Sequence, residues 1–170
     1  MQQDSFIDIF DKDQNLIATK RRSDVDKNEG YLRVVYIVVY NSSKEVFIVE
    51  LKSDDPKKQY YQKYSVSAAG LVRSKEKIDQ AAKRTLEKEL GIDGELVFLG
   101  DFTIDNPSFR RFANFYCIKY DGDIDVNKDD VEKGEFVSEE MIENMVYMDK
   151  DLFTPVFLEF WERFRNDLGW

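Results

Sequence analysis

The feature that most constrains the fold is an uninterrupted apolar run, LRVVYIVVY, at Leu32–Tyr40. β-Branched and aromatic residues dominate this run, which favours a strand, and apolar side chains occupy both of its faces. A strand of this kind is stable only where other elements cover both faces. The sequence therefore predicts a central strand in a sheet that is covered on both sides.

Shorter strands are expected around this central strand. Alternating apolar and polar residues predict an opening hairpin and a second hairpin that joins the central strand to the next one. The expected strands are residues 6–10, 16–18, 46–51, 95–104 and 111–120, with a short strand that ends at 136–137. Polar loops are predicted at residues 20–28 and 53–63.

Three helices are expected, at residues 78–90, 139–145 and 152–164. Over 78–90 the apolar residues recur with a period of 3.6, and Gly91 is placed to end that helix. The last helix carries an aromatic face, which we expect to pack on the sheet rather than bind a ligand. That face consists of Phe153, Phe157, Phe160, Trp161 and Phe164. Together these elements predict one α+β domain over residues 3–168.

The amino-acid composition limits which catalytic and metal-binding groups the chain can use. The chain of 170 residues contains no histidine and one cysteine, Cys117. This excludes a Ser-His or Cys-His dyad, a histidine-ligated metal, an internal disulfide and a cysteine-ligated zinc. Acid–base chemistry must therefore use Asp, Glu, Lys, Tyr or that cysteine.

Charge bears on location and partners. Lys and Arg total 25 against 34 Asp and Glu, a formal net charge of −9. Such a chain lacks the basic surface of a general nucleic-acid binder. The first residues do not resemble a signal peptide, and no apolar run approaches the ~18 residues of a membrane span. We expect a soluble, cytoplasmic protein that binds neither nucleic acid nor membranes, and the sequence leaves homodimer formation open.

Glu89 stands out on the helix predicted at 78–90. It follows Leu86 by three positions and Ala82 by seven, so it shares their apolar face. A carboxylate on such a face is costly unless it is paired or binds a metal. Glu89 is therefore either an ion-pair partner of Lys88 or Arg84 at the rim of the core, or a metal ligand.

The segment around Glu89 resembles the Nudix box, whose pattern is G-x5-E-x7-R-E-U-x-E-E-x-G-U, with U a bulky aliphatic residue. The matches at full spacing are Gly70, Glu76, Arg84, Leu86, Glu89, Gly91 and Ile92. The resemblance implies a mixed β-sheet sandwiched between helices, in which the box forms a loop and a helix. It also implies glutamates that hold Mg²⁺ or Mn²⁺ against a diphosphate. Gly70, Glu76, Arg84 and Gly91 are then structural residues of the box, with Glu76 paired to Arg84.

Two carboxylates of the box pattern are missing. Thr85 stands where the pattern has a glutamate after the arginine, and Lys88 replaces the first glutamate of its E-E pair. Glu89 is thus the main candidate for metal binding and catalysis, and the general base is unassigned. Lys88 is a second catalytic candidate, because its ammonium could bind the diphosphate in place of one metal. Alternatively, its long side chain turns outward to solvent.

Four cations are candidates for binding the substrate. Arg73 and Lys75 lie in the loop before the predicted helix, beside the expected diphosphate. Arg33 and Lys52 lie in segments that resemble the isopentenyl-diphosphate isomerase branch of the superfamily. Isomerase activity itself is not expected, because Ala69 occupies the position of that branch's cysteine and the chain has no histidine.

The segment 121–140 is strongly acidic. The resemblance implies that this region adds an acid to the metal site, and Glu132 and Glu135 are the candidates. Acids from Asp121 onward also match positions of an EF-hand loop, but Val126 stands where that loop requires glycine. A solvated loop is therefore preferred over a calcium site.

The sequence thus predicts a Nudix-type hydrolase of a small-molecule diphosphate linked to another moiety. Water attacks a phosphorus, with the charge stabilised by a divalent ion at Glu89 and either Glu132 or Glu135. The competing interpretation is a non-catalytic Nudix domain that binds a nucleotide or a protein partner.

Overall fold

The fold combines a large mixed sheet, a separate hairpin and three α-helices in the computed structural model, which describes residues 5–26, 29–52, 62–107 and 109–170. The strands are β1 Phe6–Phe10, β2 Leu16–Arg21, β3 Leu32–Tyr40, β4 Glu45–Leu51, β5 Tyr64–Ser65, β6 Ala68–Leu71, β7 Val97–Asn106, β8 Phe109–Lys119 and β9 Val131–Ser138. The helices are α1 Ile78–Leu90, α2 Glu139–Met148 and α3 Pro155–Phe164. Short 3-10 turns are formed by Arg22–Asp24, Lys150–Leu152 and Arg165–Asp167.

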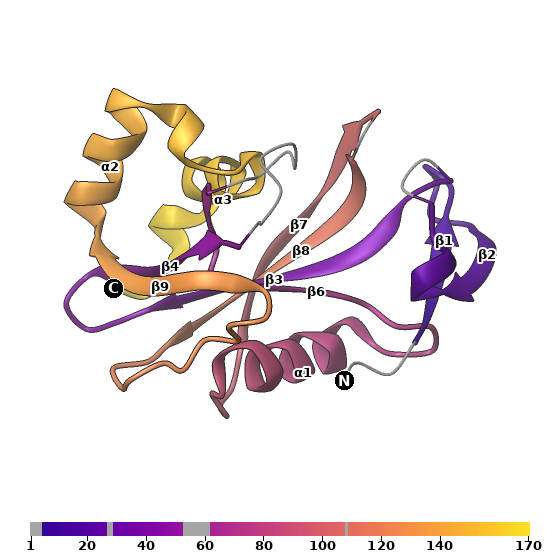
Figure 1. Ribbon diagram of the computed structural model, residues 1–170, viewed down its shortest axis with the longest axis horizontal. Coiled ribbons are helices and arrows are strands. Elements are labelled where there is room, and N and C mark those ends of the chain that lie inside the picture. Colours follow the sequence, from indigo (N-terminus) through magenta and orange to yellow (C-terminus); the bar gives the residue numbers. More distant parts are fainter. Residues whose placement is uncertain (1–4, 27–28, 53–61, 108) are drawn as a thin grey trace.

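The large sheet lies between helices, so the α+β class and the layered architecture expected from the sequence are confirmed. Its strand order is β5-β4-β3-β8-β7, with β6 paired to β3 and β9 paired to β4. Helix α1 covers one face, α2 and α3 lie on the other, and hairpin β1-β2 stands at one end (Figure 1).

Strand β3 is the central strand that its two apolar faces predicted. Val35 and Ile37 are fully buried in the cluster that includes the apolar face of α1. Tyr36 and Val38 point the other way, into the cluster that includes α3. Successive side chains of a strand alternate between its faces, so one strand supplies both halves of the core. Beside it, β8 runs parallel to β3 along the whole strand.

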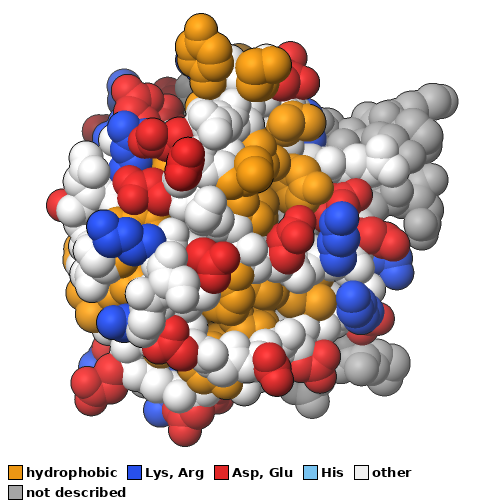
Figure 2. Space-filling view, turned by 90° about the vertical axis from the view of Figure 1, so that its left-hand side faces the viewer, with side chains coloured by type: hydrophobic (Ala, Val, Ile, Leu, Met, Phe, Trp, Pro, Cys, Tyr) orange, Lys and Arg blue, Asp and Glu red, His pale blue; other side chains and the backbone are white. Residues whose placement is uncertain are grey.

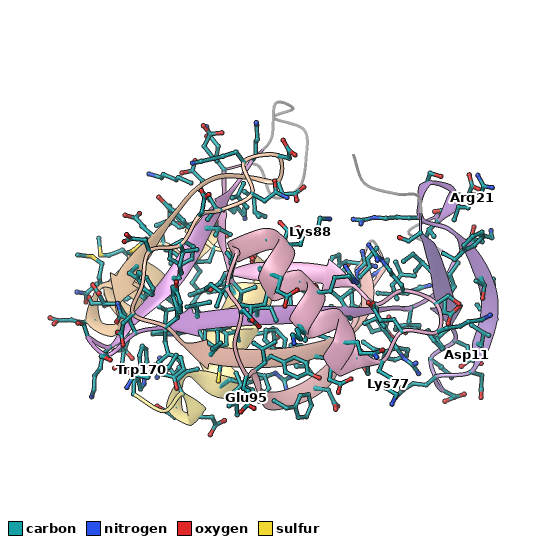
Figure 3. All side chains as sticks on the ribbon, turned by 90° about the horizontal axis from the view of Figure 1, so that it is seen from below. Asp11, Arg21, Lys77, Lys88, Glu95 and Trp170 are labelled. Atoms are coloured by element: carbon teal, nitrogen blue, oxygen red, sulfur yellow. The ribbon has the colours of Figure 1, made fainter. Side chains whose placement is uncertain are left out.

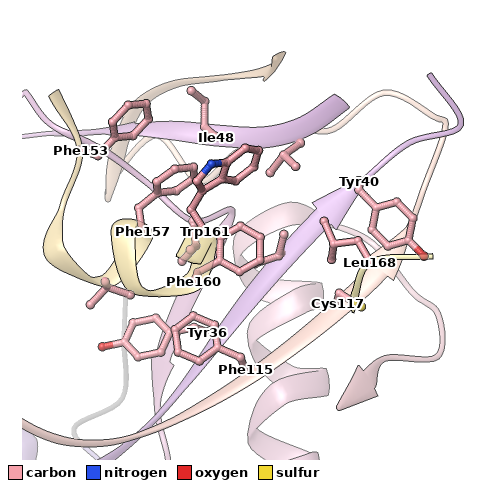
Figure 4. Packing of buried hydrophobic residues seen from close by; sticks show 14 of the residues in the cluster. Tyr36, Tyr40, Ile48, Phe115, Cys117, Phe153, Phe157, Phe160, Trp161 and Leu168 are labelled. Carbon is pink, nitrogen blue, oxygen red and sulfur yellow. The ribbon is translucent and has the colours of Figure 1, made fainter. Parts of the chain in front are cut away.

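The aromatic face of α3 packs on the sheet, as predicted. Phe157 and Phe160 are completely buried, and the Phe160 ring stacks on Phe115 of β8 with centroids 6.3 Å apart. Figure 4 shows these rings between α3 and the sheet. The helix begins at Pro155 because Thr154 caps it: the Thr154 hydroxyl accepts a hydrogen bond from the Phe157 amide at 3.2 Å. The predicted start at 152 instead falls in a 3-10 turn.

Helix α1 occupies the predicted residues 78–90. The Gln80 side chain accepts a hydrogen bond from the Lys77 amide at 3.0 Å and thereby caps the first turn. Gly91 ends the helix in the left-handed conformation, at φ 66°, and its amide donates to the Glu87 carbonyl.

Strands β3 and β4 separate soon after their turn, so the predicted second hairpin opens. They pair at Tyr40 and Val46, and farther from the turn, along Val34 to Ile37 of β3, β6 takes the place of β4. The Ser67 hydroxyl bridges the split: it accepts from the Val39 amide at 2.8 Å and donates to the Phe47 carbonyl at 2.6 Å. The split matters because the polar site described below opens beside it.

Other elements differ modestly from the expectations. Strands β5 and β6 were not predicted, and β9 is longer than the short strand expected there. Strand β2 continues to Arg21, into the predicted loop 20–28. Most of the loop predicted at 53–63 lies outside the described residues.

On the face seen in Figure 2, the acidic, basic and apolar side chains of the described residues are interspersed, and the basic ones among them form no continuous area. Among the described residues, none of the helices has the length and apolar character needed to cross a membrane.

Candidate active site

An ion pair braces the loop that precedes α1. Arg84 donates two hydrogen bonds to the carboxylate of Glu76, from Nε to Oε2 at 2.8 Å and from Nη2 to Oε1 at 2.9 Å. The same guanidinium donates to the Leu71 carbonyl, and the Arg73 amide donates to Glu76 Oε1. Burial disfavours the charge on Glu76, but these hydrogen bonds outweigh it and lower the pKa of the carboxyl. The predicted Glu76–Arg84 pair is therefore present in the structure.

A polar hollow of about 190 Å³ lies between the second half of α1, strands β4 to β6 and the segment before β9. Its charged or polar lining includes Arg22, Ser65, Ser67, Arg84, Thr85, Lys88, Glu89 and Asp130. Figure 3 looks at α1 from outside the sheet and shows Lys88 and Lys77 near opposite ends of this helix. The hollow lies at the Lys88 end.

Two carboxyl groups meet in the polar hollow, those of Glu89 and Asp130. The Glu89 side chain is 15% exposed. This burial, together with the charge and hydrogen bonding of Asp130, raises the pKa of Glu89 to about 7. Lys88 and Asn127 act in the opposite direction, but they are too weak to offset these effects. A group that attracts a proton so strongly would also be stabilised by a metal cation.

The segment before β9 is tied to the end of α1, and this tie places Asp130. The Asn127 amide donates to the Glu89 carbonyl at 3.1 Å, and the Asn127 side-chain amide donates to Asp130 Oδ2 at 3.1 Å. Asn127 also accepts from the Asp129 amide, which closes an Asx turn. One asparagine thus holds both the loop and the orientation of the Asp130 carboxylate.

Lys88 lies beside Glu89 at the mouth of the polar hollow. Its Nζ is 3.8 Å from Glu89 Oε1, and its side chain is 34% exposed. The ammonium can therefore both neutralise Glu89 and reach a ligand in the hollow. This N–O distance is long for an ion pair, so the interaction is weak and neither side chain fixes the position of the other.

Thr85 occupies the box position that usually carries a carboxylate. It is 1% exposed, and its Oγ1 has no hydrogen-bond partner among the described residues. A threonine hydroxyl is not an acid or a base near neutral pH. The general base therefore stays unassigned.

The four cations predicted to bind substrate are not among the residues that line the polar hollow. Arg73 and Lys75 are exposed on the loop before α1, and Arg33 lines a separate depression, where its guanidinium lies over the Phe10 ring. Lys52 is exposed and donates to the Lys128 carbonyl. Substrate binding by these four side chains stays a prediction.

The predicted downstream acids, Glu132 and Glu135, are also exposed and do not line the hollow. Glu135 pairs with Ile48 of β4, whose side chain belongs to the core on the α3 side of the sheet. Cross-strand partners share a face, so Glu135 points away from α1. A metal role for either glutamate stays a prediction, and the carboxylate beside Glu89 is that of Asp130.

Asp121, the first acid of the EF-hand-like series, is engaged elsewhere. Its carboxylate accepts from the amide and the hydroxyl of Ser42, both at 2.7 Å, and these bonds lower its pKa. This agrees with the preference for a loop over a calcium site.

The residues that sequence reasoning missed are Asp130 and Arg22. Asp130 was passed over because spacing along the chain does not reveal which acid of the loop turns toward α1. The available signal was Asn127, an asparagine in a run of acids, which is typical of an Asx turn and here forms one with the Asp129 amide. Arg22 follows β2 and reaches the hollow only because the hairpin folds toward β6.

The donor set fits one divalent cation better than a cluster of them. Mg²⁺ is commonly bound by one or two carboxylates, with substrate phosphates and water completing its shell. Glu89 and Asp130 supply that number of carboxylates. Over the part of the chain that the structure describes, there is no group of three or more Asp, Glu, Cys or His placed to hold a metal.

Comparison with known proteins identifies the family. The NUDIX domain model matches residues 30–157, and the chain belongs to this family. An uncharacterised Nudix hydrolase of Clostridium acetobutylicum is 31% identical over 132 residues, which cover 72% of this chain and 63% of the relative. A second, from Yersinia pestis, is 30% identical over 117 residues, which cover 68% and 63%. The matches thus span less than two thirds of these relatives.

Solved structures share the fold at low sequence identity. A protein of Deinococcus radiodurans, described as a hypothetical Nudix protein, aligns with a TM-score of 0.75 and 20% identity, covering 94% of this chain and 99% of its own. The NUDIX domain of Shewanella oneidensis NrtR, solved in complex with ADP-ribose, aligns with a TM-score of 0.64 and 12% identity, covering 86% and 96%. The likeness to the isomerase branch has no support among these matches and stays a prediction.

Proposed function

We propose that this chain hydrolyses a diphosphate linked to another moiety, X, and that it uses a single divalent ion. The observation that carries the proposal is the convergence of Glu89 and Asp130 in the polar hollow at the end of a braced Nudix box. Membership of the Nudix family supports it.

The side chains of the hollow divide into two groups. Glu89 and Asp130 would hold Mg²⁺ or Mn²⁺, which when bound neutralises phosphate charge and polarises a phosphoryl oxygen. Arg22 and Lys88 bring positive charge to the same hollow and bind the phosphate oxygens. In this arrangement Lys88 supplies charge that a second metal ion would otherwise bring.

The reaction is a displacement at phosphorus. The oxygen of water bonds to a phosphorus of the diphosphate, and the bond from that phosphorus to the bridging oxygen breaks. One proton of the water stays on the phosphate group that it forms and the other is released to solvent, and the products are two phosphates, one of which keeps X.

The test is phosphate release from a panel of diphosphate esters in the presence of Mg²⁺ or Mn²⁺. Glu89→Gln and Asp130→Asn should each lower kcat by about tenfold or more, because each removes a carboxylate charge from the metal site. Glu87→Gln, at an exposed position of the same helix, is the matched control and should turn over like the parent. Full activity in both site variants would contradict the proposal.

The second candidate function is ligand binding without turnover. Thr85 and Lys88 favour it, because together they remove two carboxylates that the box pattern provides. The NrtR domain solved with ADP-ribose shows that a NUDIX domain can be captured with such a ligand bound. Saturable binding of a diphosphate ester in calorimetry, with no phosphate released over hours with either metal, would favour this reading over hydrolysis.

A further inference from the structure

A second hollow, of about 310 Å³, lies next to the polar one. The two share residues at the split of the sheet: Arg22, Leu51, Ser65, Ala69, Gly70 and Leu71. The polar hollow lies on the α1 side, whereas the second hollow is walled partly by α3 residues such as Val156. A ligand could therefore extend from one hollow to the other around the split edge between β4 and β6.

The walls of the second hollow are mainly apolar, and we call it the apolar hollow. Tyr36 and Val34 of β3 face it, and their cross-strand partners Ala69 and Leu71 of β6 share that face. Phe109 also contributes to the wall. The Tyr36 ring is stacked on Phe115 with centroids 5.0 Å apart, so this part of the wall is fixed by the core.

Three side chains with hydroxyl groups line the apolar hollow, Tyr36, Ser65 and Thr154, and two of these hydroxyls are already hydrogen-bonded to each other. Ser65 Oγ and Thr154 Oγ1 are hydrogen-bonded to each other at 2.9 Å. Thr154 Oγ1 also accepts from the Phe157 amide as the cap of α3. These groups can offer little to a ligand without weakening the helix cap.

Apart from these three hydroxyl-bearing residues, the polar side chains among the described lining are the cations Arg22 and Arg111. Arg111 lies over the Phe109 ring, 4.5 Å from its centroid, and donates to the Arg110 carbonyl. Arg22 lines both hollows, which suits contact with a phosphate at their junction. Among the described lining residues there is no Asp, Glu, Asn or Gln. Such side chains are the usual acceptors for the amino groups of nucleobases, as Asp or Glu is for cytosine N4.

From these observations we propose that X is an unsubstituted hydrocarbon group, which lies in the apolar hollow while the diphosphate lies in the polar hollow. The inference rests on the proposed function and specifies its substrate class. The amino group of a base such as cytosine would lose its hydration there and find no carboxylate or amide acceptor among the described lining residues, whereas an alkyl group would lose nothing.

The test measures binding by calorimetry with Mg²⁺ present. The probes are methylenediphosphonate, its pentyl monoester and its cytidine 5′ ester, because their bridging carbon cannot be cleaved. The pentyl ester should bind at least about tenfold more tightly than methylenediphosphonate, since its chain is transferred from water to an apolar wall. The affinity of the cytidine ester should exceed that of methylenediphosphonate by about twofold or less.

The variant Ala69→Phe tests where the pentyl group lies. Ala69 is exposed and faces the apolar hollow, so a ring there fills the space without disturbing the core. The variant should reduce the advantage of the pentyl ester to about twofold or less, with Ala69→Leu intermediate. Ile17→Phe adds a ring at an exposed site on β2 and should keep the parental advantage. Circular dichroism checks that each variant is folded.

The outcomes separate this inference from the proposed function. If methylenediphosphonate and both esters fail to bind, the proposed diphosphate site itself is wrong. If methylenediphosphonate binds but the pentyl chain adds nothing, or if cytidine adds as much as pentyl, the hydrocarbon class is wrong. An unchanged pentyl advantage in Ala69→Phe would place the chain outside the apolar hollow and overturn the inference.

Discussion

The side chain of Thr85 fills the space into which a side chain at Gly70 would project. A Cβ on Gly70 would overlap Thr85 Oγ1, and Thr85 is 1% exposed, so it has little room to move away. Gly70 and Thr85 therefore join β6 to α1 by direct contact. The glycine of the box is required here by close approach rather than by its backbone angles.

Gly70→Ala should destabilise the protein by about 1–3 kcal/mol, because the added methyl group overpacks this contact. The double variant Gly70→Ala with Thr85→Ala should recover most of the loss, since shortening Thr85 makes room. Urea unfolding gives both free energies. If the double variant loses as much free energy of unfolding as the two single variants lose together, or more, the contact with Thr85 does not limit residue 70.

Ser67→Ala should destabilise the protein by about 2 kcal/mol. The hydroxyl bridges the split between β3 and β4, and its loss leaves the Val39 amide and the Phe47 carbonyl unpaired and buried. Ser43→Ala, in the exposed turn between the same strands, should change stability by about 0.5 kcal/mol or less. Equal effects in the two variants would show that the bridge contributes nothing.

Glu89 should make the metal-free protein less stable as the pH rises. Its pKa of about 7 in the fold lies above the ordinary value of 4.5, so the fold favours the protonated form. The stability gained from that proton is complete below pH 4.5 and is lost as the pH rises through about 7. The loss amounts to about 3 kcal/mol.

Glu89→Gln removes this titration. In buffer with a chelator, the variant should be more stable than the parent at pH 8, and this advantage should shrink toward pH 5. Denaturant unfolding at several pH values measures it, with Glu87→Gln as the control. A difference that does not change with pH would mean that the Glu89 carboxyl is not perturbed.

Lys88→Glu should strengthen metal binding. It replaces the ammonium beside Glu89 with a third carboxylate near Asp130, which favours a hard divalent cation. Added Mn²⁺ should then raise Tm more in the variant than in the parent, because a ligand stabilises the state that binds it. Lys83→Glu makes the same charge change at an exposed position of α1 and should respond like the parent.

The elements that could be predicted were those whose signal is local. The two apolar faces of β3 and the 3.6 period of α1 are visible in consecutive residues. The predicted ranges, 32–40 and 78–90, agree with the structure. The pairing of Glu76 with Arg84 followed from the box spacing. The short strands β5 and β6 were not predicted, because so few residues do not show a recognisable periodicity.

The partner of Glu89 could not be found in the same way. Asp130 reaches Glu89 through the Asn127 turn and through the register of β9 on β4, neither of which is fixed by spacing along the chain. The sequence therefore indicated the acidic segment but not which of its acids lies beside Glu89. Arg22 depends in the same manner on how the hairpin folds against the sheet.

The parallel pairing of β3 with β8 has a consequence for the order in which the molecule assembles. It joins residues distant in the chain: the Asn114 side chain donates to the Val34 carbonyl across 80 positions. Closing so long a loop is slow, whereas α1 and its braced loop form from neighbouring residues. β9 follows β8 in the chain and docks on β4, so Glu89 acquires Asp130 late. During refolding, the helical signal should therefore return before the capacity to bind metal.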